Sequence, residues 1–246
     1  MALSGQLPLV SLPPQMQAEL RMSGLAGHWG ACNRCGLCQR RRHMIWGAGS
    51  LRAPIMIVNS TTSGYDNQNG TPLAGPGGEL VAHILTRLGL NPARDCYVTN
   101  LVKCLCPKKS EEDGTLRRRL PTHDEVEVCK VAVEEQIKII DPCILILYGQ
   151  QASRYLLGDP RPLAKFAGHW RTYGKRCVAL SAYGPNGLMM GDDSVSKQAT
   201  YFNLWLETAE KLNLLGRMWR PDAQLFQDGW AFNPPAPIGQ LGVSAC

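Results

Sequence analysis

Four short apolar runs of strand length alternate along the chain with segments of helical periodicity. The runs cover residues 53–59, 96–99, 143–148 and 177–181 and are rich in branched side chains. Strands that alternate with helices at this spacing are typical of a parallel sheet with helices on both faces. The pattern therefore predicts a three-layer α/β/α protein built around a central four-stranded parallel sheet.

Five helices are expected around these strands. A short helix follows Pro13, and the others lie near 78–88, after Thr122, over 150–157 and over 195–214. The helix after Thr122 brings one set of side chains to a single face, namely Val126, Cys129, Val133, Ile137 and Ile140. Cys129 is therefore expected to point into the core.

The distribution of Pro, Gly and charged residues divides the chain into three segments. Residues 1–30 form a lead-in, residues 31–215 form the α/β domain, and residues 216–246 form an extension rich in Pro, Gly and Trp. A polar, highly charged insertion at 108–119 interrupts the domain. We expect the extension to wrap over the domain or to dock on a protein partner.

Composition narrows the class of protein. A chain of 246 residues with 44% hydrophobic side chains can bury an ordinary core, which excludes wholesale disorder. Its net charge of +6 is compatible with a polyanionic partner. No stretch approaches the roughly 18 apolar residues of a membrane-spanning helix, and residues 1–10 lack a signal-peptide pattern. We expect a soluble cytoplasmic protein with no membrane partner.

Cysteines supply the first candidate chemistry. Six of the ten gather in three places: Cys32, Cys35 and Cys38, then Cys104 and Cys106, then Cys129. A Cys-x-x-Cys pair such as Cys32 and Cys35 can hold one edge of a metal site, which needs two further ligands. Cys104 and Cys129 are the natural second pair. A [4Fe–4S] cluster, a zinc site and a set of free thiols all remain open, although zinc ribbons normally present a second close pair.

Several motifs occur in the order of a known family. They are Cys32 to Leu37, the Gly-rich stretch Gly70 to Gly78, the segment Val98 to Cys104, and Cys129 with its helix. Over about residues 30–215 the sequence resembles the iron–sulfur uracil-DNA glycosylases, known as family four. The resemblance implies the uracil-DNA glycosylase fold, DNA as the partner and excision of a base that is flipped out of the helix.

The resemblance also assigns roles to particular residues. It implies a [4Fe–4S] cluster held by four ligands: Cys32, Cys35, Cys104 and Cys129. The insertion lengthens the separation between the last two, so Cys106 or Cys38 could replace one of them. It further implies that Asn100 reads the base edge and that Leu73 packs on the base where the family has an aromatic ring. As an alternative, Asn100 only caps the end of a strand.

The expected active site departs from the family pattern. The turn that positions the attacking water corresponds to Asn59 to Ser63, which lacks the family's acid and proline. The final His-Pro-Ser turn corresponds to Gly184 to Leu188, where Gly184 and Asn186 would lie beside the base and no histidine is present. Because a donor aimed at developing charge contributes roughly 10²–10³ in rate, uracil excision by the family's usual route is expected to be weak or absent.

The remaining candidates concern water and DNA. Polar side chains available to hold the attacking water are Ser60, Thr61, Asp66 and Asn67. Leu188 and Met189 take the place of the apolar wedge that enters the duplex. Arg117, Arg118 and Arg119 in the insertion are expected to contact phosphate.

Three functions follow from these observations. The first is a DNA glycosylase with altered base preference, which hydrolyses the N-glycosidic bond of a uracil-like or modified base. The second is a catalytically inactive protein that keeps the fold for DNA binding or as a replication accessory. The third is a pocket for a free nucleotide or nucleoside. The lost acid and histidine favour the second function, while Asn100 and the Gly-rich loop favour a base pocket.

Overall fold

A six-stranded mixed sheet forms the centre of the protein. The computed structural model describes residues 12–109, 116–185, 201, 203–208 and 210–211. The strand order is β1-β3-β2-β6-β8-β7. Its four inner strands are mutually parallel: β3 (Cys96–Leu105), β2 (Ile55–Thr62), β6 (Ile144–Tyr148) and β8 (Cys177–Ala182). These correspond to the four predicted strands, although β2 and β3 continue to Thr62 and Leu105, beyond their predicted ends at 59 and 99.

The prediction of only four strands is wrong because each edge carries one more. At one edge β1 (Ala48–Gly49) pairs antiparallel with β3, and at the other β7 (Trp170–Tyr173) pairs antiparallel with β8. β1 has two residues, and no side chain of β7 is fully buried. Neither segment therefore has the apolar run that marks an inner strand in a sequence.

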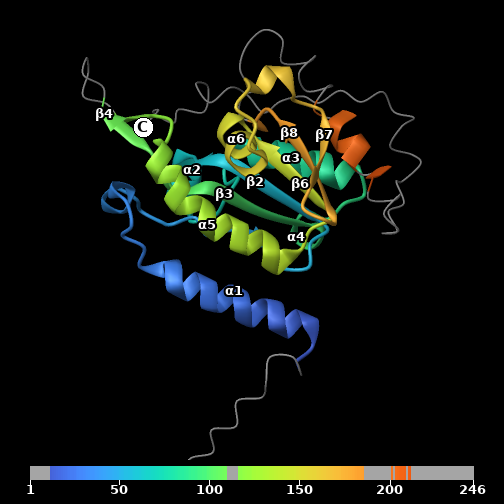
Figure 1. Ribbon diagram of the computed structural model, residues 1–246, viewed down its shortest axis with the longest axis horizontal. Helices are drawn as coiled ribbons and strands as arrows, with labels where there is room; N and C mark the ends of the chain where they lie inside the picture. Colours follow the sequence, from blue (N-terminus) through green and yellow to red (C-terminus); the bar gives the residue numbers. More distant parts are fainter. Residues whose placement is uncertain (1–11, 110–115, 186–200, 202, 209, 212–246) are drawn as a thin grey trace, which may run out of the picture.

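Helices cover both faces of the sheet, which confirms the three layers (Figure 1). Ile55 and Ile57 of β2 pack toward α3 (Pro76–Arg87), together with the helical residues 201 and 203–208. Met56 and Val58 face the other way, toward α5 (His123–Ile140) and α6 (Gln150–Leu157). Outside α5 runs α1 (Pro14–Gly30), so the predicted short helix is in fact 17 residues long.

Several shorter elements complete the described chain. They are η2 (Gly36–Gln39), α2 (Gly64–Asn69), α4 (Pro92–Asp95), β4 (Pro107–Lys109), β5 (Leu116–Arg118) and η3 (Leu163–Lys165). β4 and β5 form a hairpin from the two ends of the charged insertion. No helix is predicted at the position of α2, which forms there because Ser63 and Asp66 make a capping box at its start.

Other predictions about helices are confirmed or lie beyond the described residues. Thr122 caps α5, and Cys129 is buried on its inner face as predicted. Residues 195–200 and 212–214 of the predicted last helix, and the extension 216–246, lie outside the described residues. Within the described part of the chain, no helix is both long and apolar enough to cross a bilayer.

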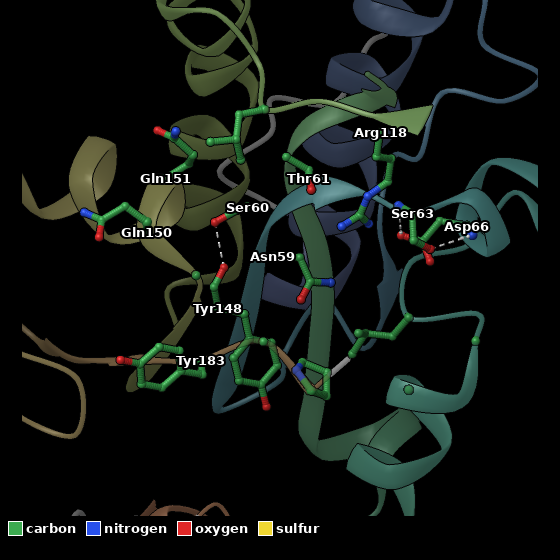
Figure 2. A pocket seen from close by; sticks show the side chains of 17 residues that line it. Asn59, Ser60, Thr61, Ser63, Asp66, Arg118, Tyr148, Gln150, Gln151 and Tyr183 are labelled. Atoms are coloured by element: carbon green, nitrogen blue, oxygen red, sulfur yellow. Dashed lines mark hydrogen bonds between the residues drawn. The ribbon is translucent and has the colours of Figure 1, made fainter. Parts of the chain in front are cut away.

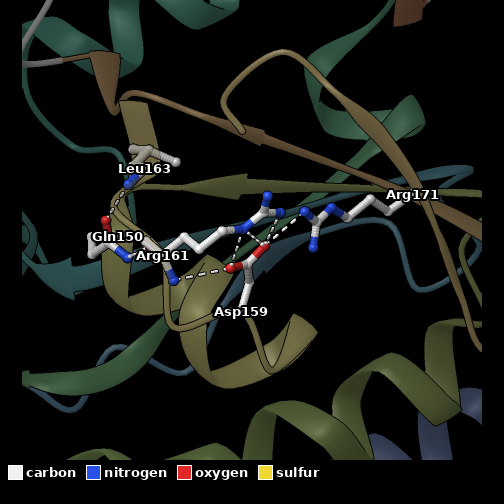
Figure 3. Close-up of polar contacts among 5 residues, drawn as sticks. All are labelled: Gln150, Asp159, Arg161, Leu163 and Arg171. Atoms are coloured by element: carbon white, nitrogen blue, oxygen red, sulfur yellow. Dashed lines mark hydrogen bonds and ion pairs between the residues drawn. The ribbon is translucent and has the colours of Figure 1, made fainter. Parts of the chain in front are cut away.

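A buried carboxylate ties the segment after α6 to the edge of the sheet (Figure 3). Asp159, 5% exposed, accepts hydrogen bonds from the Arg161 guanidinium and backbone, and pairs with Arg171 Nη2 of β7 at 2.7 Å. Gln150 binds the same segment at Arg161 O and Leu163 N. The Arg161 guanidinium holds the pKa of Asp159 well below its usual range, against the opposing effect of burial.

Replacing Asp159 is expected to change how stability depends on pH. A carboxyl whose folded pKa is depressed contributes its full stability above the unfolded value of about 4, and loses it as pH falls toward the folded pKa. Asp159→Asn should therefore lower the urea midpoint most near pH 7. The difference in urea midpoint between the variant and the native protein, called the gap below, should shrink between about pH 4 and pH 2.

Urea unfolding followed by circular dichroism across this range measures the gap. Asp124→Asn, an exposed carboxyl on α5, is the matched control and should show little change. A gap that stays constant down to pH 2 would contradict the assignment.

Candidate functional site

A cavity opens at the carboxyl ends of the parallel strands (Figure 2). It has a volume of about 720 Å³ and is lined by the ends of β2, β6 and β8, the loop before α3, β5 and the start of α6. β3, the next strand along the chain, lies on one side of β2, and β6 lies on the other side. The strand order therefore reverses direction at β2, and open α/β sheets bind their ligands at such a reversal.

Ser60, a predicted water-holding residue, ties two strands together at the cavity wall. Its Oγ donates to Tyr148 O at 2.8 Å and accepts from Ala152 N at 3.0 Å. Gly149 has φ +90°, and a Cβ there would lie 2.7 Å from Ser60 Oγ. Thr61, next along β2, lines the cavity, and its hydroxyl bonds no residue that the structure describes.

Asp66 and Asn67, the other two predicted water-holding residues, also form hydrogen bonds with other residues. The Asp66 carboxylate is 3% exposed and accepts from Ser63 N, Ala74 N and Asn100 Nδ2, so it fixes the loop before α3. Asn67 does not line the cavity; its Oδ1 accepts from the backbone N–H of Arg42 at 2.8 Å. Thr61 is the one of the four predicted side chains that faces the cavity without a described partner.

Asn100, the predicted base reader, lies behind the cavity wall. Its side chain is fully buried, donates from Nδ2 to Thr62 Oγ1 and Asp66 Oδ2, and accepts at Oδ1 from Asn59 Nδ2. Asn59 stands in front of it and lines the cavity. Sequence reasoning placed Asn59 only at the start of the water-positioning turn and gave its amide no role of its own, although an amide at the end of a buried strand is a usable signal.

Leu73 and Gly184 both line the cavity, as the base-contacting prediction requires. Leu73 adopts φ +53°, a left-handed backbone that is costly for a branched residue and is often found at functional sites. Gly78 permits this turn, because a Cβ there would lie 1.7 Å from Leu73 O. Asn186, Leu188 and Met189 lie outside the described residues.

Tyr183 is a lining residue that sequence reasoning missed. It follows β8 directly, is half exposed, and offers an aromatic ring to the cavity. An aromatic residue at the carboxyl end of an inner strand was the available signal. The ring gives the cavity a face on which a planar ligand could stack.

The three predicted phosphate contacts have different surroundings. Arg118 of β5 lines the cavity, and its guanidinium lies between Thr61 and Ser63 in Figure 2. Arg119 instead forms a bidentate pair with Glu125 of α5 at 2.6 and 2.7 Å, which raises the pKa of the arginine and lowers that of the carboxyl. Arg117 lies in β5 opposite Lys108.

The cysteines gather at the other side of β3. Cys104 and Cys129 are buried in one hydrophobic cluster, with Cys35 packed against it and Arg41 Nη1 3.5 Å from Cys104 Sγ. Burial raises the pKa of Cys129 to about 11, and the pKa values of Cys35 and Cys104 also rise for this reason. Ionised Cys104 and Cys35 would raise the pKa of Cys129 further, and ionised Cys32 and Cys35 would do so for Cys104.

The spacing of these thiols limits what they can hold. Among the described residues, no three ligand side chains lie close enough to bind a single metal ion. Cys106, the predicted substitute ligand, is buried in the same cluster and donates from Sγ to Cys104 O. Cys38 is partly buried on η2. The structure thus brings thiols from three distant parts of the sequence to one region without a mononuclear geometry.

The side chain of Lys103 is buried beside these thiols. It is 1% exposed, and its Nζ donates to Trp46 O, Thr99 Oγ1 and Gln136 Oε1. The Thr99 hydroxyl donates to Trp46 O at 2.8 Å, and Gln136 Nε2 donates to Trp46 O and Tyr97 Oη. When Lys103 donates to all three groups at once, it uses the three N–H bonds of the ammonium form.

Lys103 Nζ has no carboxylate among its hydrogen-bond partners in the described chain. Burial lowers the pKa of Lys103 to about 7, and ionised Cys129 and Cys104 would act in the opposite direction. A buried charge is costly unless an opposite charge is near. Thiolates at these cysteines would provide that charge.

Comparison with known proteins identifies the family. The model of the uracil DNA glycosylase superfamily matches residues 46–210, which include every strand that forms the cavity. The chain belongs to the uracil-DNA glycosylase superfamily. The predicted family is thereby confirmed.

Individual proteins align with parts of the chain. A type-4 uracil-DNA glycosylase of Pyrobaculum aerophilum is 30% identical over 126 residues, which are 51% of this chain and 59% of that protein. Another, of Saccharolobus solfataricus, is 28% identical over 162 residues, or 63% and 70%. A DNA polymerase of Bacillus phage SP01 is 31% identical over 110 residues, or 45% of this chain and 11% of the polymerase.

Proposed function

We propose that the protein binds DNA and hydrolyses the N-glycosidic bond of a flipped base, with a base preference that differs from that of its type-4 relatives. The cavity at the ends of β2, β6 and β8 carries this proposal. It combines a buried amide, an apolar side chain on a strained turn, an aromatic ring and a cation, from Asn59, Leu73, Tyr183 and Arg118. An apolar cavity with a few convergent polar groups suits a nucleobase.

The reaction needs a water molecule and a stabilised leaving group. Water oxygen attacks C1′ of the nucleotide, the C1′–N bond breaks, and the base leaves with the bonding electron pair while the water loses a proton. Thr61 is positioned to hold the water, because its hydroxyl faces the cavity and has no described partner. No histidine lines the described cavity, so a base that leaves more readily than uracil is the better substrate.

A second candidate is a non-catalytic DNA-binding or replication-accessory protein. The observation in its favour is that Ser60 and Asp66 are both engaged in structural hydrogen bonds. In this case the extension 216–246, with Trp219 and Trp230 among prolines, would dock on a protein partner. Binding without excision distinguishes it from the first candidate.

We further propose a [4Fe–4S] cluster on Cys32, Cys35, Cys104 and Cys129. Such a cluster is several ångströms across, so its four sulfur ligands stand farther apart than those of one ion. The buried Lys103 amine supports the assignment, because Nζ has no carboxylate among its described hydrogen-bond partners and the charges of Cys104 and Cys129 would act on it. When bound, the cluster supplies a covalent tie between the Cys32–Cys35 segment, β3 and α5.

Excision of modified bases tests the main proposal. The purified protein is incubated with oligonucleotides that contain uracil, hypoxanthine or 5-hydroxymethyluracil, and alkali then cleaves any abasic site. At least one base should be excised, and Thr61→Val should slow its excision by roughly a hundredfold.

Thr71→Val, the same change in the neighbouring loop, is the control and should retain the rate. Binding with no excision across the panel would favour the accessory protein. Full activity in Thr61→Val would remove Thr61 from the mechanism.

Neutralising Arg118 should weaken DNA binding in a salt-dependent way. If Arg118 contacts one phosphate, Arg118→Gln should reduce the slope of log affinity against log salt by about 1. Arg52→Gln is the control, because Arg52 is exposed just before β2, at the amino ends of the strands. Anisotropy titrations at several salt concentrations give both slopes, and equal slopes for the two variants would exclude this contact.

The cluster assignment predicts a difference between cysteines. Cys104→Ser should abolish absorbance near 400 nm, remove bound iron and sulfide, and lower the yield of folded protein, because metal binding is coupled to folding. Cys143→Ser, a cysteine outside the group, should leave all three unchanged. A folded Cys104→Ser protein with full iron content would rule out Cys104 as a ligand.

A further inference from the structure

A chain of buried hydrogen bonds determines which atom Asn59 presents to the cavity. The chain runs from Thr62 and Asp66 through Asn100 to Asn59. Asn100 is fully buried and Asn59 is 8% exposed, so no solvent intervenes between the two amides. The orientation of both side chains follows from counting donors and acceptors.

The first link fixes Asn100. Thr62 Oγ1 gives its single proton to Val102 O at 2.9 Å, so it can only accept from Asn100. Asp66 accepts backbone N–H bonds at both carboxylate oxygens, and an ionised carboxylate only accepts. The Asn100 atom that lies 3.1 Å from Thr62 and 3.2 Å from Asp66 is therefore Nδ2.

The second link fixes Asn59. With Nδ2 of Asn100 engaged, its Oδ1 faces Asn59 and requires a donor. Nδ2 of Asn59 supplies that donor at 3.1 Å. Oδ1 of Asn59 is then left as an acceptor on the cavity side, and no described residue bonds it. Rotating the amide by half a turn would bring two carbonyl oxygens together in a buried place, which is unfavourable.

We infer that Asn59, rather than Asn100, reads the edge of the bound base, and that its Oδ1 selects a base with a ring N–H, as in uracil-like and hypoxanthine-like imides and lactams. Asn100 is a positioning residue that acts through Asn59, because its buried side chain lies behind that amide. This inference rests on the proposed function in one respect, namely that a nucleobase occupies the cavity.

Methylation of the ring nitrogen gives a direct test. Single-stranded oligonucleotides carry either 2′-fluoro-2′-deoxyuridine, whose glycosidic bond resists hydrolysis, or its N3-methyl counterpart. A single strand removes the effect of methylation on base pairing. The protein should bind the N3–H oligonucleotide more tightly by roughly ten- to a hundredfold, because the methylated base leaves the buried acceptor unpaired.

Variants separate reading from folding. Asn59→Leu keeps the branched shape of the side chain and should bind the two oligonucleotides within about threefold of each other, since its acceptor is gone. Asn69→Leu makes the same change on exposed α2, outside the cavity, and should discriminate like the native protein. Thr62→Val, which removes one acceptor that orients Asn100, should reduce the ratio without weakening binding of the methylated base.

The outcomes distinguish this inference from the proposed function. Discrimination between the two oligonucleotides without any excision would support Asn59 as the residue that reads the base, and it would exclude glycosylase activity. Excision with no discrimination in the native protein, or undiminished discrimination in Asn59→Leu, would overturn the reading by Asn59 alone. If no oligonucleotide binds, free 1-methyluracil and 1,3-dimethyluracil are compared by ligand-observed NMR, and binding of neither would overturn both proposals.

Discussion

The pairing of buried polar groups on β3 is the constraint on which the rest of the structure depends. Asn100 and Lys103 lie three residues apart on a strand whose surroundings exclude water, so every donor and acceptor must find a protein partner. Asn100 meets Thr62, Asp66 and Asn59, while Lys103 meets Trp46, Thr99 and Gln136. One strand therefore organises the cavity wall and the region of the cysteines.

The same requirement limits which residues are free for chemistry. Ser60 and Asp66 have the functional groups expected of a site that activates water, yet both are engaged in holding the backbone around the cavity. A hydroxyl or carboxylate that already satisfies several buried N–H groups is poorly suited to move during a reaction. The polar groups left facing the cavity are fewer than the sequence implies, and Asn59 and Thr61 are chief among them.

The arginines near the cavity also divide between a structural role and a cavity-facing role. Consecutive arginines of the insertion have different roles, since Arg119 anchors the β4–β5 hairpin to Glu125 and Arg118 lines the cavity. Arg118 is the last residue of β5 and Arg119 directly follows it, so the two side chains meet different environments. The hairpin thus combines an anchor on one side with a cation beside the proposed base site on the other.

The sequence by itself determined the inner strands, most helices, the family and the residue types of the site. These features are local, because apolar periodicity, capping residues and ordered motifs are visible without distant contacts. Only the tertiary structure decided that Asn59 stands in front of Asn100 and that Asp66 holds the loop before α3 through hydrogen bonds. It also decided that Arg118 rather than Arg119 reaches the cavity. Each of these facts depends on which donor from one strand meets which acceptor from another, and that pairing exists only once the strands have packed.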